Sequence, residues 1–361
     1  MLSQDERNYG CRVSDSWTYR GLRTAVLENE LLRIVVLIDK GADIYQFVHK
    51  PTDVDFLWRS PWGVVDQTRL QPTTGAGESL WMDLYEGGWQ TVLPGGGNAS
   101  RYRGADLGIH AEVSTMPWNC QIVEDTPEKA SIRFWVRGLR TPFSCEKTLT
   151  LTSGSSVLEI NEAIVNEAEE TAHCVWGQHI ALGAPFLSED CVVDIPGGTL
   201  TNHHEDHHPN NRLKAGAEGT WPWTEGKDGN RIDLSKIPPK SLRAYDLSYV
   251  SEMPDGWYAV TNQKTGLGWG VVYPKDLFRY LWFWQSIGGG YGYPWWGRTY
   301  NVGLEPFTGY SNEGLAGAVE NGTALTLEAG QRVEATIKAI AYTGAERVER
   351  INTDGSLVRR T

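Results

Sequence analysis

The chain has 361 residues, and its 33 Lys and Arg against 45 Asp and Glu leave a formal net charge of −12. Both nucleic acid and anionic membranes repel such an excess of negative charge, so neither is expected as a partner. Hydrophobic residues make up 40% of the chain, which is enough for a large core, and no apolar run reaches the roughly 20 residues that span a bilayer.

Short strand patterns separated by turn residues follow one another along the chain. Residues 24–50 predict a strand, a turn at 28–30, a buried strand over 32–38, a turn at Gly41 and a further strand. Residues 129–138 alternate apolar and polar side chains with period two, as do residues 144–170 on both sides of a turn at Gly154. Residues 256–274 predict a hairpin that turns near Gly266, and residues 323–344 predict another strand pair. Helical periodicity is scarce, so these patterns predict an all-β fold, a large β-sandwich or a barrel-like relative.

A polar, turn-rich segment at about 201–241 interrupts the strand patterns. No repeat or linker divides the chain, so we interpret the segment as a long excursion from one domain that covers residues 1–361. The run HHEDHH at residues 203–208 holds side chains of metal-ligand type. Because no second ligand group stands at a known spacing, a solvated loop is the preferred interpretation and no metal is expected. Contact of one of these imidazoles with a ligand in a cleft stays open.

The cysteines give an expectation about the compartment. There are five, without CxxC spacing: Cys11, Cys120, Cys145, Cys174 and Cys191. An odd number of cysteines, with no apolar signal-peptide core at the N-terminus, predicts reduced thiols and a cytoplasmic location.

The chain is rich in rings, with 16 Trp and 15 Tyr, and several of them gather at residues 282–301. Tryptophan has a large rigid face with one donor at its edge, which suits a cleft that stacks on sugar rings. The candidates for stacking are Trp89, Trp284, Trp295 and Trp296, and the candidates for binding hydroxyls or an anionic substituent are Gln285 and Arg298. The alternative is that about half of these rings form core and that Arg298 neutralises a nearby acid.

Three side chains are candidates for proton chemistry. Glu305 lies in the strand-like stretch VGLEPFT, where a buried carboxylate is costly unless it has a partner or a role. His110 and His179 each lie in an apolar stretch with glycine nearby. Taken singly, each histidine is better explained as a hydrogen-bonded core residue. Taken together, the three form a general acid/base set, because imidazole titrates near pH 6.5 and burial raises the pKa of a carboxyl toward that range.

The stretches LIDKGADIYQF, IHAEVS, WGQHIALGAP and GLEPFT, in this order, resemble the galactose mutarotase-like superfamily, which contains aldose 1-epimerases and less characterised relatives. The resemblance extends from about residue 24 to about residue 343. It implies a large β-supersandwich with an open cleft and an aldose 1-epimerase-like isomerase activity. It further implies that Glu305 removes the proton of the anomeric hydroxyl, that His179 protonates the ring oxygen, and that His110 helps to hold that oxygen. No metal or redox cofactor is implied.

The sequence also departs from the aldose 1-epimerases. His110 is followed by Ala111 and not by glycine, and no clear substrate-binding arginine is present. Arg101 and Arg103 are possible replacements, with an ordinary surface position as the alternative. We therefore expect the interconversion of α and β anomers of an aldose or modified aldose, with a small carbohydrate as the partner.

Two other functions stay open at this point. One is a carbohydrate-binding protein without catalysis. The other is a lyase or hydrolase, and an inverting hydrolase needs a second carboxylate, for which Asp106 and Glu112 are the nearest candidates. The sequence does not decide between a monomer and a homodimer.

Overall fold

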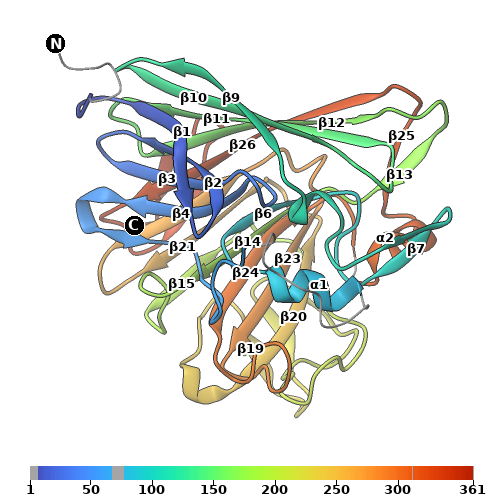
Figure 1. The fold of residues 1–361 in the computed structure, drawn as a ribbon. Coiled ribbons are helices and arrows are strands. Elements are labelled where there is room, and N and C mark those ends of the chain that lie inside the picture. Colours follow the sequence, from blue (N-terminus) through green and yellow to red (C-terminus); the bar gives the residue numbers. More distant parts are fainter. Residues whose placement is uncertain (1–6, 67–76, 311, 361) are drawn as a thin grey trace.

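The computed structural model describes residues 7–66, 77–310 and 312–360. Two large antiparallel sheets pack face to face (Figure 1). The larger, 14-stranded sheet has the order β1-β2-β3-β4-β6-β14-β24-β23-β20-β16-β17-β18-β19, with β5 paired to β4. Its strands are β1 (Arg12–Tyr19), β2 (Leu22–Glu28), β3 (Leu32–Leu37), β4 (Asp43–His49), β5 (Val54–Asp55), β6 (Trp89–Val92), β14 (Gly177–Gly183), β16 (Thr199–Asn202), β17 (Glu218–Thr220), β18 (Trp223–Glu225), β19 (Arg231–Asp233), β20 (Ala244–Ser251), β23 (Tyr280–Ile287) and β24 (Tyr300–Phe307).

The smaller sheet has eight strands in the order β15-β21-β22-β26-β12-β11-β10-β9. They are β9 (Asn119–Asp125), β10 (Lys129–Arg137), β11 (Phe143–Thr152), β12 (Val157–Asn166), β15 (Cys191–Asp194), β21 (Trp257–Asn262), β22 (Leu267–Val272) and β26 (Arg332–Tyr342). Strands β9 to β12 cross over the larger sheet in Figure 1.

Short elements complete the described chain. Three two-stranded ribbons pair β7 (Ser100–Tyr102) with β8 (Ala105–Leu107), β13 (Ala172–Cys174) with β25 (Leu325–Leu327), and β27 (Val348–Ile351) with β28 (Leu357–Arg359). The helices are α1 (Gly77–Leu84) and α2 (Gly314–Glu320), with short 3-10 turns η2 (Lys50–Thr52), η3 (Val113–Thr115) and η4 (Lys240–Leu242). No helix among the described residues is long and apolar enough to cross a membrane.

The main hydrophobic core lies between the two sheets. Alternate side chains of each strand enter it, such as Ile34 and Val36 of β3 and Ile132 and Phe134 of β10. This is the period-two pattern that the sequence shows, because successive side chains of a strand point to opposite faces. The predicted hairpin is also present, since Asn262 of β21 pairs with Leu267 of β22. The all-β sandwich predicted from the sequence is confirmed.

A second apolar cluster covers the outer face of the larger sheet, and α1 lies over this face in Figure 1. It is unusually aromatic, and its members include Trp58, Trp81, Tyr85, Tyr249, Trp282, Trp284, Trp295 and Phe307. Strands β14, β23 and β24 are therefore buried on both faces.

The segment at 201–241 continues the larger sheet. Strand β16 pairs with β17, and β18 and β19 follow at the edge. The polar excursion therefore consists largely of sheet-edge strands and their turns. That the whole chain is one domain remains a prediction.

Candidate functional site

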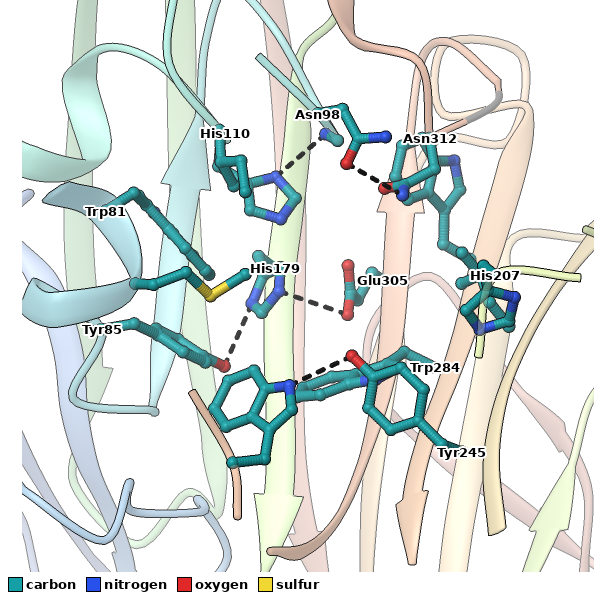
Figure 2. Close-up of a pocket in the computed structure, with 16 residues that line it drawn as sticks. Trp81, Tyr85, Asn98, His110, His179, His207, Tyr245, Trp284, Glu305 and Asn312 are labelled. Atoms are coloured by element: carbon teal, nitrogen blue, oxygen red, sulfur yellow. Dashed lines mark hydrogen bonds and ion pairs between the residues drawn. The ribbon is translucent and has the colours of Figure 1, made fainter. Parts of the chain in front are cut away.

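Neighbouring strands β14 and β24 bring an imidazole and a carboxylate together. Their register pairs Gly177 with Phe307 and Ala181 with Gly303, which places His179 opposite Glu305. Residues 178, 180 and 182 of β14 point to the inter-sheet core, so His179 points to the outer face (Figure 2). His179 Nε2 lies 3.6 Å from Glu305 Oε1, and both side chains are at least 95% buried. The fold thus provides an acid/base pair at the middle of a sheet.

The pair lies in a cavity of about 160 Å³. The cavity is lined by Trp81, Met82, Tyr85, Gly97, Asn98, Ile109, His110, His179, His207, Tyr245, Leu247, Trp282, Trp284, Trp295, Glu305 and Asn312. Glu305 Oε1 is buried and has no hydrogen-bond partner among the described residues. A buried carboxylate oxygen without a partner is costly, so this atom is a candidate for contact with a ligand.

His110 joins the pair from a loop that follows β8. Its backbone is in the left-handed region, with φ of 46°. The Gly97 backbone N–H donates to His110 Nδ1 over 3.2 Å, so the ring proton is on Nε2 when the imidazole is neutral. The ring centroids of His110 and His179 are 4.8 Å apart. His110 therefore offers an N–H donor beside His179, as Figure 2 shows.

Aromatic and amide side chains form the walls. Trp81 packs on both imidazoles, and the Tyr85 hydroxyl lies 3.4 Å from His179 Nδ1. Trp295 Nε1 donates to the Tyr245 hydroxyl over 3.1 Å. On the far side of the cavity in Figure 2 lie His207 and the amides Asn98 and Asn312. These walls combine flat apolar faces with a few donors and acceptors.

Burial controls the protonation of the central groups. It raises the pKa of Glu305 well above the ordinary range of a carboxyl. It lowers the pKa of His179 well below 6.5, an effect to which His110 and Lys40 add by charge repulsion. Burial also lowers the pKa of His110 to about 3. Without a ligand, burial therefore favours the uncharged forms of both groups, a protonated Glu305 and a neutral His179.

Two of the predicted aromatic residues line the cavity, and two other candidates face the opposite way. Trp284 and Trp295 are in the cavity wall. Gln285, the next residue of β23, points to the other face, where its Oε1 accepts from Arg212 over 3.0 Å. Trp89 is in the inter-sheet core and donates to Gln178 over 2.8 Å. The structure therefore gives no support for sugar contacts by Gln285 and Trp89.

The other candidates for substrate binding lie at the surface. Trp296 is 63% exposed, and Arg298 is exposed two residues later. Arg101 is on β7 beside Asp106, and both of these side chains are more than 70% exposed. Arg103 donates to the Thr171 carbonyl over 2.7 Å. None of these four candidates is among the residues that line the cavity.

The candidate second carboxylates are also engaged elsewhere. Asp106 is the exposed partner of Arg101. Glu112 accepts hydrogen bonds from the backbone of Leu139, Arg140 and Thr141 and from the Thr141 hydroxyl. Glu112 thereby anchors the loop after β10. Among the described residues, Glu305 supplies the one carboxylate in the cavity wall.

Sequence reasoning missed several cavity residues. Trp81 and Tyr85 stand four residues apart at α1, a spacing that places two rings on one helix face. Asn98, Asn312 and His207 come from loops, where the sequence carries no signal of convergence. The histidine run at 203–208 does reach the cavity through His207, and its first two histidines meet Glu313.

Solved structures of other proteins share this architecture. A candidate aldose 1-epimerase from Klebsiella pneumoniae superposes with a TM-score of 0.70 at 14% identity, over 92% of this chain and 83% of that one. A galactose mutarotase-like protein from Clostridium acetobutylicum gives 0.63 at 12%, over 93% and 99%. A galactose mutarotase related enzyme from Lactobacillus acidophilus gives 0.60 at 18%, over 89% and 97%. The fold is therefore galactose mutarotase-like, as the resemblance implied.

No curated protein matches the chain. A family model does match it, over residues 19–340. Because this match covers most of the sequence, the chain belongs to the family described as domain of unknown function DUF4432.

Proposed function

We propose that the cavity binds one uncharged monosaccharide and interconverts its α and β anomers. The observation that carries this proposal is the buried pair His179–Glu305 in an aromatic cavity of about 160 Å³. Glu305 Oε1 lies 3.6 Å from His179 Nε2 and has no hydrogen-bond partner among the described residues. The similarity to the solved mutarotase-like structures supports the fold of such an enzyme, and the activity rests on the site.

The walls suit a sugar ring. The faces of Trp81, Trp284 and Trp295 offer apolar surface to the C–H groups of a pyranose. Asn98, Asn312 and the N–H of His110 offer hydrogen bonds to hydroxyls. Among the described residues, none of those that line the cavity is a lysine or an arginine. An anionic substituent would be desolvated there without a cation, so the substrate we propose is neutral.

The reaction needs one proton to leave the C1 hydroxyl and one proton to arrive at the ring oxygen. In the sense that the resemblance implies, Glu305 removes the proton of the C1 hydroxyl while His179 protonates the ring oxygen. The C1–O5 bond breaks, a carbonyl forms at C1, and rotation about C1–C2 followed by ring closure gives the other anomer. Ring closure returns both protons to their starting positions, so no co-reactant is consumed.

Sugar binding must shift the proton of the pair for this sense of reaction. Without a ligand, burial raises the pKa of Glu305 and so favours its protonated form. Hydroxyl groups that donate to the carboxylate stabilise its charged form and favour transfer of the proton to His179. In the reverse sense, His179 takes the C1 proton and Glu305 protonates the ring oxygen. Both senses use the same two groups, so both require Glu305.

A non-catalytic carbohydrate-binding protein is the alternative outcome. Such a protein needs the cavity walls to bind a sugar, but it does not need the pair His179–Glu305. A hydrolase has less support, because Asp106 and Glu112 are engaged outside the cavity. A water-activating second carboxylate at roughly 6.5–9.5 Å from the first is therefore not available from these two residues.

The test is anomer exchange measured by polarimetry and NMR on a panel of neutral and acidic monosaccharides. We expect faster exchange with at least one neutral sugar, a loss of about 10²-fold or more in Glu305→Gln, and no change in Glu349→Gln, which alters an exposed carboxylate on β27. Saturable binding without exchange would instead support the binding protein. Exchange that Glu305→Gln leaves intact would overturn the assignment of the site.

A further inference from the structure

Two histidines and a glutamate meet at the edge of the cavity. His203 and His204 follow β16, and Glu313 precedes α2. Glu313 Oε1 lies 3.8 Å from His203 Nε2 and 3.5 Å from His204 Nε2. Each of the three residues offers one ligand atom, and these three atoms all lie within 4.8 Å of one another. The fold thus supplies the second ligand group that the sequence around 203–208 lacks.

A hydrogen bond orients the buried member of this cluster. His203 is 5% exposed, and its Nδ1 lies 2.8 Å from the Tyr249 hydroxyl. With the ring proton on Nδ1, the lone pair of Nε2 faces Glu313. Histidines that bind metals usually donate the other ring N–H to a fixed partner, which sets the tautomer and the ring orientation.

The spacing is close to that of a metal site. Zinc bonds of about 2.0–2.1 Å at tetrahedral angles place neighbouring ligand atoms roughly 3.3 Å apart. The two histidine–glutamate separations exceed this by less than about 0.6 Å. The side chains of His204 and Glu313 are 48% and 34% exposed, so both have room to move by this amount. Two imidazoles and one carboxylate are also a ligand set that zinc and similar cations use.

We propose that His203, His204 and Glu313 bind a divalent transition-metal ion of the zinc class. Three protein ligands leave a fourth position for water or for His207, whose ring centroid lies 5.3 Å from that of His203. Both ring nitrogens of His207 are buried without a hydrogen-bond partner among the described residues.

The ion would join two segments that build the cavity wall. His207 follows His203 and His204 by a few residues, and Asn312 precedes Glu313 directly; both His207 and Asn312 line the cavity. In Figure 2 these two residues stand on the same side, away from Trp81 and Tyr85. The proposed ion would therefore hold together the two segments that form this side of the cavity. It takes no part in the proton transfer between His179 and Glu305.

The test uses the full-length protein after removal of metals by a chelator. Zn²⁺ is titrated by calorimetry and by competition with a chromogenic indicator, and Co²⁺ absorption reports the coordination geometry. We expect one ion per chain and a loss of affinity of about 100-fold or more in His204→Asn and in Glu313→Gln. Both variants change partly exposed side chains, and circular dichroism checks that they fold.

The matched control is His208→Asn, in the same histidine run. His208 Nδ1 accepts from the backbone N–H of Asn210 over 3.1 Å, and the residue is not a member of the cluster, so we expect unchanged affinity. Tyr249→Phe tests the positioning of His203 and should weaken Zn²⁺ binding about tenfold. The proposal would be overturned if the folded wild type bound neither Zn²⁺ nor Co²⁺. It would also be overturned if His204→Asn and Glu313→Gln bound Zn²⁺ as tightly as the wild type. These readouts do not depend on anomer exchange.

Discussion

The single proton shared by His179 and Glu305 sets the pH range in which the proposed reaction runs. Both senses of the reaction require one proton on the pair, so activity falls when the pair gains a second proton or loses its only one. Free histidine and glutamate would hold one proton only between about pH 4.3 and 6.5. Burial lowers the pKa of His179, so the second proton binds at lower pH. Burial raises the pKa of Glu305, so the last proton leaves at higher pH.

We therefore expect kcat/KM for anomer exchange to fall toward acid pH as His179, whose pKa burial lowers, gains a proton, and to fall toward alkaline pH as Glu305, whose pKa burial raises, loses its proton. The measurement is the initial rate of exchange at a series of pH values, with the buffer-catalysed rate subtracted. An alkaline fall centred near the ordinary carboxyl pKa of about 4.3 would contradict the raised pKa of Glu305.

Gly303 keeps the space that the Glu305 carboxylate occupies. The two residues are on the same face of β24, and a Cβ atom at position 303 would lie 2.1 Å from Glu305 Oε1. We expect Gly303→Ala to turn the carboxylate away from His179 and to slow anomer exchange by about 10²-fold, the lower end of what a placed acid or base contributes. Thermal unfolding should show a native fold.

Gly95→Ala is the matched control for this prediction. A Cβ atom at position 95 would meet Leu315 at 3.5 Å, an ordinary contact. We expect its exchange rate to stay within about twofold of the wild type. Equal rates for Gly303→Ala and Gly95→Ala would contradict the role that we give to Gly303.

At the scale of elements, three ionisable side chains connect the turn after β3, strand β4 and the segment before β6. Lys40 Nζ lies 2.6 Å from Asp43 Oδ2 and 2.8 Å from Glu86 Oε2, and all three side chains are at most 2% exposed. Breaking a buried ion pair by removing one partner typically costs about 3–5 kcal/mol, because a charge is left uncompensated. We expect this loss of unfolding free energy in Lys40→Met, measured by urea denaturation.

The double variant Lys40→Met with Glu86→Gln is the informative control. Burial raises the pKa of Glu86 to about 8 against the opposing positive charge of Lys40, so the loss of Lys40 favours the protonated carboxyl further. Removing the carboxyl together with the lysine leaves one buried acid fewer, so the double variant should recover part of the lost stability. If the double variant lost as much unfolding free energy as Lys40→Met and Glu86→Gln lose together, the two groups would not be coupled.

The strands of the smaller sheet were predictable because one side of them is exposed. Along β10 and β11 the buried and exposed positions alternate, which is the pattern that the sequence shows. Strands β14, β23 and β24 are buried on both faces, so their sequences do not show which side chains face the cavity. Trp284 and Gln285 are neighbours on β23, yet one lines the cavity and the other faces the opposite way.

The acid/base residues could be proposed from local stretches and from the resemblance to a family, because each lies in a motif of its own. The residues that loops bring into the cavity could not be proposed in this way. His207 and Asn312 reach the cavity through backbone that pairs over long sequence separations, and no local pattern encodes that convergence. For the same reason no local pattern points to a second ligand group beside His203 and His204, whereas the fold brings Glu313 to them.

At the scale of the whole molecule, a buried polar network joins the two sheets. Glu162 of β12, in the smaller sheet, accepts from three side chains of the opposite layer. Its Oε1 accepts from Thr91 over 2.6 Å, and its Oε2 accepts from Trp176 over 3.0 Å and Gln178 over 2.6 Å. Gln178 precedes His179, so this network lies directly behind the acid/base pair. The inner face of the sheet thereby holds the strand that presents the site on its outer face.

We expect Glu162→Ala to lower the unfolding free energy by about 3 kcal/mol or more, because three buried donors lose their acceptor at once. Exchange activity should fall as well, since β14 loses a contact one residue from His179. The matched control is Glu159→Ala on the same strand, where the side chain is 40% exposed and the expected change is within about 0.5 kcal/mol. Urea denaturation at constant m-value measures both variants. A loss in Glu162→Ala no larger than that in Glu159→Ala would mean that apolar packing alone holds the two sheets in register behind the site.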